Sequence, residues 1–129
     1  MRRVISICFL WIVIGCANRS TDCRALVAQI HNDHIDWNGH IGGLYVSGMG
    51  EVERSVQAAG SPCRPFLVEA LDDDSRFVAA HVLLTHIQKK PWPVSGAEWN
   101  HLRIQLYTDG RVEVPNGQKE RIKGTLTQR

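Results

Sequence analysis

The chain has 129 residues, of which 43% are hydrophobic and 22% charged, with a formal net charge of +2. This length fits a single domain, and the abundance of apolar residues excludes low-complexity disorder. A chain with so small an excess of basic residues has no feature typical of nucleic-acid binding. The composition therefore predicts a small folded domain without a nucleic-acid partner, and it does not identify a molecular activity.

The N-terminal segment has the pattern of an export signal. Arg2 and Arg3 precede an apolar run from Val4 to Ile14 that only Ser6 interrupts. As a helix rising about 1.5 Å per residue, this run would extend roughly 16 Å, against about 30 Å for the hydrocarbon core of a membrane. It is too short to span a bilayer but fits the apolar region of a signal peptide. We therefore expect residues 1–15 to be a signal peptide; the alternative is a buried N-terminal helix or strand.

The run ends in Val13-Ile14-Gly15-Cys16, which resembles the lipobox of bacterial lipoproteins. In those proteins a small residue precedes a cysteine that is acylated and becomes the new N-terminus. Leu is usual where Val13 stands, and a smaller residue is usual where Ile14 stands. The resemblance implies a lipid on Cys16, residues 16–21 as a tether, and a membrane-anchored lipoprotein of the cell envelope that faces the periplasm or the exterior. Simple cleavage, or retention of the segment, is the alternative.

The remaining cysteines suit an exported protein. Cys8 lies in the expected signal peptide and Cys16 is the expected lipid site, which leaves Cys23 and Cys63 as a pair. Export exposes a chain to oxidising conditions, so this pair is a disulfide candidate. A bridge closing a loop of about 41 residues would stabilise the fold by roughly 4 kcal/mol in the chain-entropy model. Spacing alone does not distinguish a bridge from two reduced cysteines.

Residues 22–88 have the patterns of short helices. Thr21 or Asp22 is a suitable cap for a helix that runs to about Asn32. The five glycines of residues 38–50 predict a loop, with at most a brief extended segment over residues 44–46. A second helix is expected over residues 51–59, between Gly50 and Gly60, with Val52 and Val56 on its buried side.

Two further helices, residues 61–71 and 75–88, follow as a pair. The second is apolar nearly all round, a pattern typical of a helix at the centre of its domain. Residues 61–88 resemble a single HEAT-like repeat at the positions Pro65, Leu67, Leu71, Asp73, Val78, Ala80 and Leu84. Because a solenoid needs about three stacked repeats, the resemblance implies only a helical hairpin and no binding surface.

The C-terminal third changes to the alternation of a β-strand. Leu102, Ile104 and Leu106 alternate with polar residues, and residues 108–110 then form a turn. Only a three-residue loop pairs Leu106 with Val112, and it predicts a left-handed Gly110. Residues 118–126 fit either a third strand or a short helix. We therefore expect one α+β domain over residues 22–129, with three to four short helices in residues 22–88 and a β-hairpin in residues 99–115.

Few residues suggest chemistry. His31, His34 and His40, with Asp33 and Asp36 between them, are the densest group of metal-ligand types, and imidazole with carboxylate suits zinc. The alternative is a solvated helix end that leads into a loop. His81 is expected to be a hydrogen-bonded histidine of the core, and Trp92 and Trp99 to anchor the connection between them.

These observations favour a non-catalytic protein-interaction or structural module of the cell envelope. It would contact the membrane through its lipid, take an envelope protein as partner, and need no cofactor. Removal of residues 1–15 leaves 13 basic against 13 acidic residues, so the mature domain has no net charge to steer an ionic partner. The alternative function is a metal-dependent hydrolase that uses His31, His34 and His40, with Glu51 as base. That alternative lacks a motif such as His-Glu-x-x-His, which would fix the ligand geometry.

Overall fold

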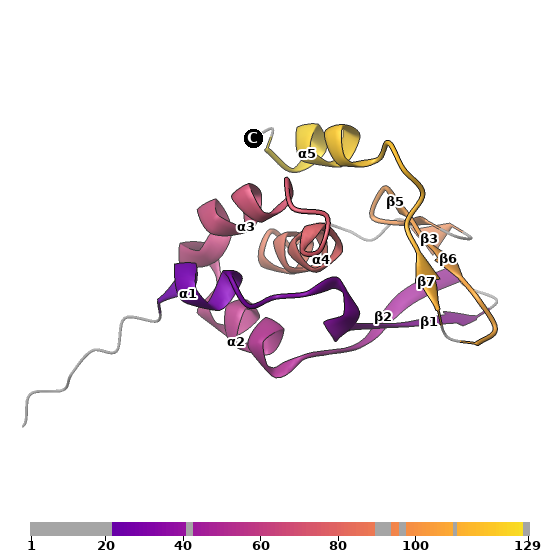
Figure 1. Cartoon of the computed structure of the whole chain (residues 1–129), viewed down its shortest axis with the longest axis horizontal. Coiled ribbons are helices and arrows are strands. Elements are labelled where there is room, and N and C mark those ends of the chain that lie inside the picture. Colours follow the sequence, from indigo (N-terminus) through magenta and orange to yellow (C-terminus); the bar gives the residue numbers. More distant parts are fainter. Residues whose placement is uncertain (1–21, 41–42, 90–93, 96–97, 110, 128–129) are drawn as a thin grey trace, which may run out of the picture.

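The computed structural model describes residues 22–40, 43–89, 94–95, 98–109 and 111–127. It is a small α+β domain in which short helices surround a central helix at one end and short antiparallel strands lie at the other (Figure 1). The expected signal peptide, Cys16 and the tether lie outside the described residues. No described helix is long and apolar enough to cross a membrane. The α-helices are α1 (Cys23–Val27), α2 (Glu51–Ala59), α3 (Arg64–Ala70), α4 (Phe77–Ile87) and α5 (Lys119–Thr127).

Helix α4 is the centre of the domain, as its apolar sequence predicts. Every residue from Phe77 to Thr85 is buried, because α2, α3 and α5 all pack against this helix. Helix α2 lies where the two flanking glycines predict it, and Gly60 ends it with a φ of 73°. That left-handed backbone is readily adopted only by glycine.

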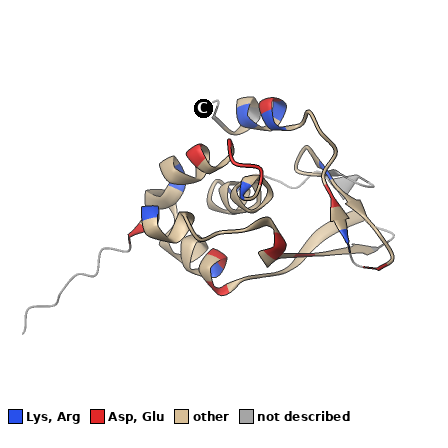
Figure 2. Cartoon of the chain, viewed as in Figure 1, with Lys and Arg blue, Asp and Glu red and all other residues tan. Residues whose placement is uncertain are grey.

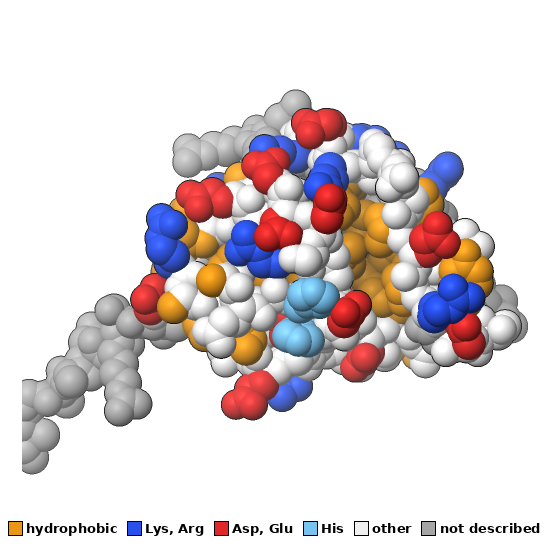
Figure 3. Space-filling view, in the orientation of Figure 1, with side chains coloured by type: hydrophobic (Ala, Val, Ile, Leu, Met, Phe, Trp, Pro, Cys, Tyr) orange, Lys and Arg blue, Asp and Glu red, His pale blue; other side chains and the backbone are white. Residues whose placement is uncertain are grey.

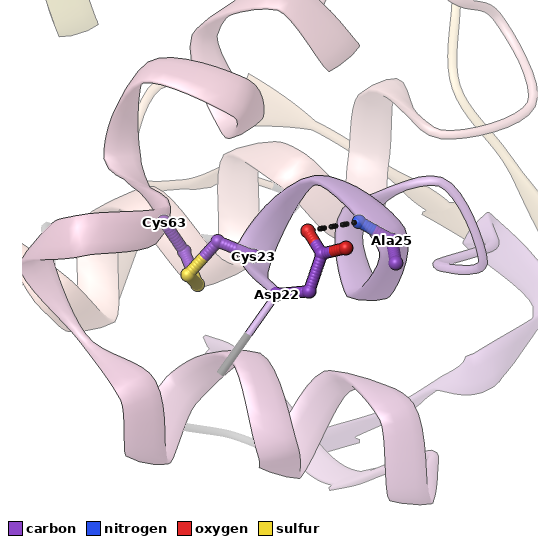
Figure 4. Close-up of a disulfide and its surroundings, with 4 residues drawn as sticks. All are labelled: Asp22, Cys23, Ala25 and Cys63. Atoms are coloured by element: carbon purple, nitrogen blue, oxygen red, sulfur yellow. Dashed lines mark hydrogen bonds between the residues drawn. A yellow bond between two sulfur atoms is a disulfide. The ribbon is translucent and has the colours of Figure 1, made fainter. Parts of the chain in front are cut away.

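A disulfide between Cys23 and Cys63 joins the first helix to the third (Figure 4). The two Cα atoms are 4.9 Å apart, within the range that a disulfide spans. Cys63 closes a short 3₁₀ helix, η2 (Ser61–Cys63), that leads directly into α3. Asp22 caps α1, since its carboxylate accepts the Ala25 N–H at 3.2 Å. The described part of the chain therefore begins at a capped and covalently fixed helix.

The first helix is shorter than the sequence predicts. We expected it to reach Asn32, but α1 ends at Val27, and residues 32–34 form a separate 3₁₀ turn, η1 (Asn32–His34). The reason lies elsewhere in the chain. The Asn32 N–H donates to the Ser75 carbonyl at 2.9 Å, and this tertiary bond replaces the one that a longer helix would make.

The glycine-rich segment is a β-hairpin, so the loop expected over residues 38–50 was wrong. Strand β1 (Ile35–His40) pairs antiparallel with β2 (Gly43–Met49). Glycine disfavours strands, but Ile35 and Leu44 are buried in the core and anchor the pair. At Gly48 a Cβ would lie 2.9 Å from the carboxylate of Asp36, its partner on β1, and a larger residue there would have to displace that exposed side chain.

The C-terminal strand is divided between two small sheets. Its first part, β5 (Leu102–Arg103), pairs with β4 (Glu98–Trp99), which in turn pairs with β3 (Val94–Ser95). Its second part, β6 (Gln105–Leu106), pairs with β7 (Val112–Glu113). The pairing of Leu106 with Val112 confirms the three-residue loop, while Gly110 lies outside the described residues. The expected single strand is interrupted at Ile104, which is buried.

A tight turn between β4 and β5 and a C-terminal helix complete the fold. Asn100 and His101 join β4 to β5 with φ values of 47° and 69°, the left-handed backbone of a tight type I′ hairpin turn. Residues 118–126 fitted either a strand or a helix, and the structure has a helix there, α5, over Lys119–Thr127. Ile122 and Leu126 lie one helical turn apart and are both buried, so helical spacing gives α5 its apolar face toward the core.

Candidate functional site

The feature best suited to binding is an apolar hollow beside η1 (Figure 3). It encloses about 570 Å³ and adjoins a second depression of about 670 Å³, with which it shares Asn32, Asp33, Trp37 and Val112. We use the name apolar hollow for the first space, after its apolar lining residues, while polar residues and a glycine form the rest of the lining. The apolar residues are Trp37, Phe77, Val78, Val112, Val114 and Pro115.

The floor of the apolar hollow is buried, and its outer wall is exposed. Phe77 and Val78 belong to the first turn of α4 and are each only 4% exposed. Trp37 is half-buried, and its ring meets the core residue Trp99 edge-on, with 5.6 Å between the centroids. Val112, on β7, is 39% exposed and is one of two large hydrophobic residues recorded as exposed in the described part of the chain.

Asn32 fixes the position of η1 against the start of α4. Its Oδ1 accepts the N–H groups of Val78 and Ala79, at 2.9 and 3.3 Å. Its Nδ2 donates to the Asp74 carbonyl at 2.6 Å. No side chain next to the helix in sequence caps α4, so Asn32 satisfies backbone donors that would otherwise be unpaired there. This side chain therefore holds one edge of the apolar hollow in place.

Glu53 fixes η1 from the other side. Its side chain is fully buried, and its Oε1 accepts the His31 N–H at 3.0 Å and lies 2.8 Å from His34 Nδ1. A Cβ at Gly50 would overlap Glu53 Oε2, so glycine is required where α2 begins. The His34 Nδ1 atom faces this carboxylate, and its Nε2 atom lies on the opposite side of the ring. The His34 side chain is 44% exposed, so this nitrogen belongs to a partly solvated ring.

The three histidines expected to bind a metal do not come together. The His31 and His34 rings are 5.8 Å apart, but His40 is at the far end of β1, about 20 Å along the strand from His34. The described residues contain no group of three or more side chains placed to hold a metal ion. His31 Nδ1 instead accepts the Asp33 N–H at 3.2 Å and caps η1.

The carboxylate beside His34 is not the one expected to act as the base of a hydrolase. Glu51 is exposed in the first turn of α2, and Glu53, two residues later, is the carboxylate that contacts His34. Glu53 was not recognised from the sequence, because acidic residues early in a helix are ordinarily explained by the helix dipole. The arrangement has a histidine and a carboxylate but no third reacting group within the described contacts.

His81 is buried in the core, as the sequence predicts, but neither of its ring nitrogens is hydrogen-bonded within the described residues, so the expected hydrogen bond is not found. It is 1% exposed, and its ring meets Trp99 edge-on at 5.4 Å. Burial lowers the pKa of His81 to about 4, because the charged imidazolium loses its hydration. Its place in the centre of the core gives it a structural role.

Comparisons with protein-family models, with curated proteins and with solved structures found no match to this chain. The geometry of the domain is therefore the basis for the function proposed below.

Proposed function

We propose that the protein is an exported, membrane-anchored and non-catalytic binding module of the cell envelope. The observation that carries the proposal is the apolar hollow, which exposes apolar side chains beside a firmly held turn. Exposed apolar surface in a concave site is typical of places where a protein binds another molecule. Asn32 and Glu53 both serve to hold η1, so the polar groups around the site favour a shaped surface over a reaction centre.

The anchoring part of the proposal rests on the N-terminal sequence. The short apolar run and Cys16 suit a lipidated N-terminus, and the disulfide at Cys23 is suited to the start of a domain that folds outside the cytoplasm. Cys16→Ser in the full chain is then expected to abolish labelling by a fatty-acid probe in a bacterium with lipoprotein machinery. Unchanged labelling would disprove the anchor without affecting the binding surface.

Binding at the apolar hollow can be tested by site-specific photocrosslinking in the cells that naturally make the protein. The photoreactive residue p-benzoylphenylalanine is placed at Val112, which lines the hollow and is 39% exposed. The matched control carries it at Tyr45, which is 38% exposed on β2 and does not line the hollow.

A discrete protein adduct from position 112, and none from position 45, is the expected result. Mass spectrometry of the adduct would identify the partner segment that contacts β7. No adduct at position 112, or the same adducts at both positions, would overturn the proposal of a binding surface at the hollow.

A further inference from the structure

The charged groups around the apolar hollow are mainly acidic. Five exposed carboxylates border the hollow and the adjoining depression, and we call them the acidic rim: Asp33, Asp36, Asp74, Glu113 and Glu120. The two cations in the same lining are both held by carboxylates. Lys119 forms an ion pair with Asp74, and Arg111 lies 2.7 Å from Asp109. Figure 3 shows acidic side chains on several sides of the apolar hollow, and Figure 2 shows acidic residues on η1 and on the segment between α3 and α4.

This acidic rim belongs to a domain with no net charge, since 13 basic and 13 acidic residues follow residue 15. The excess of carboxylates is therefore a local property of this surface. A cationic group placed at the rim would gain favourable Coulomb energy, and an anionic group would be repelled. Charge complementarity thus favours an occupant that is apolar at its centre and basic at its ends.

Strand β7 offers backbone groups to the same occupant. Within the described residues it pairs only with β6. The Tyr107 N–H donates to the Arg111 carbonyl at 2.9 Å, and the next pair along the ladder is Leu106 with Val112. Because hydrogen-bonded and non-hydrogen-bonded pairs alternate in antiparallel sheets, the Val112 N–H and C=O point away from β6. They lie at the unpaired edge of the strand, and an extended peptide can pair with such an edge.

We propose that the apolar hollow binds an extended segment of a partner protein in which apolar side chains are flanked by lysine or arginine. The segment lies along the outer edge of β7, its apolar side chains contact Trp37 and Val112, and its cations face the acidic rim. This inference rests on the proposed function and adds the chemistry of the partner.

The inference predicts a charge preference that synthetic peptides can measure. Fluorescence anisotropy of a labelled Lys-Val-Leu-Val-Lys peptide, titrated with the full chain at low ionic strength, is compared with that of Glu-Val-Leu-Val-Glu. We expect the basic peptide to bind at least tenfold more tightly, and added salt to reduce the difference. Equal binding of the two peptides, or binding of neither, would overturn this inference.

Substitutions at Val112 locate the binding. Because this side chain is exposed, opposite charges can be introduced at one position. Both variants lose the apolar contact of Val112, so the effect of charge is the difference between them: the basic peptide is expected to bind Val112→Lys at least fivefold more weakly than Val112→Glu. Val112→Pro removes the outward N–H, fixes φ and replaces the Val side chain, and it is expected to weaken binding of both peptides. Circular dichroism and urea midpoints first establish that each variant is folded.

Unchanged binding of the basic peptide to Val112→Lys would place the site elsewhere and overturn the inference. A double Asp33→Asn/Asp74→Asn variant is expected to lose most of the charge preference, with Glu51→Gln/Glu69→Gln as the control on exposed carboxylates outside the rim. Failure of the proposed function would appear separately, as the absence of a crosslinked adduct at Val112.

Discussion

The Oδ1 atom of Asn32 accepts the backbone N–H of Val78 at 2.9 Å and so caps a helix that begins 45 residues later in the chain. The same amide accepts from Ala79 and donates to the Asp74 carbonyl. One side chain thus joins η1 to the buried helix α4. Asn32 also lines the apolar hollow, at the place where these two elements meet.

Asn32→Ala is expected to lower the free energy of unfolding by about 1–2 kcal/mol, the usual cost of losing a helix cap. The N–H groups of Val78 and Ala79 would be left without their present partner, and urea denaturation measures the loss. Asn38→Ala is the matched control, because Asn38 is exposed on β1 and its replacement should change stability by less than about 0.5 kcal/mol. Equal effects of the two substitutions would contradict the capping role of Asn32.

Glu53→Ala is expected to destabilise the domain by about 2–3 kcal/mol, because it leaves the His31 N–H and the His34 ring without their shared buried acceptor. Glu53→Gln keeps an acceptor oxygen and should cost less. The control is Glu51→Ala, since Glu51 is exposed on the same helix. Urea unfolding of the three variants tests the order, which would be refuted if Glu51→Ala were as damaging as Glu53→Ala.

The disulfide should supply a large share of the stability. Its cysteines are 40 residues apart, and closing a loop of that length stabilises a chain by about 4 kcal/mol in the entropy model. The urea midpoint is therefore expected to fall sharply in the presence of a reductant. A Cys23→Ser/Cys63→Ser variant has no bridge to lose, so its urea midpoint should equal that of the reduced wild-type chain both with and without the reductant. Thiol titration of the denatured, unreduced protein provides a second measurement, and free thiols at both positions would contradict the bridge.

His81 should make the domain less stable in mild acid. Its folded pKa is about 4, below the ordinary value of 6.5, so the unfolded chain binds the proton more readily. Above pH 6.5 the ring is neutral in both states, and the folded domain keeps its full stability. As the pH falls from 6.5 toward 4, the unfolded chain is protonated first, and the free energy of unfolding decreases. At about 1.36 kcal/mol per pKa unit, the loss over this window is on the order of 3 kcal/mol.

The contribution of His81 can be separated from that of other groups with His81→Leu, which removes the titrating ring. Burial also lowers the pKa of His86, so a smaller pH dependence should remain in this variant. Unfolding by urea at several values between pH 4 and pH 7 measures both slopes. Equal slopes in the wild-type chain and the variant would show that His81 does not cause the acid sensitivity.

Features that depend on neighbouring residues could be predicted from the amino-acid sequence. The apolar residues around α4 predict its central position, since a helix without a polar face must be enclosed. The alternation near Leu106 predicts its pairing with Val112, because a shift of one residue would turn the apolar side chains to the other face. Gly50 and Gly60 likewise predict the limits of α2.

Features that depend on how distant elements meet could not be predicted in this way. The glycines of β1 and β2 oppose a strand locally, and burial of Ile35 and Leu44 outweighs them. Glu53 has the pattern of an ordinary helix-terminal acid until η1 places two donors on it. The apolar hollow also requires β1, α4 and β7 to meet around one space. The periodicity of apolar residues predicts which face of an element is buried. It does not predict which group a polar side chain contacts, because that depends on how whole elements are placed relative to one another.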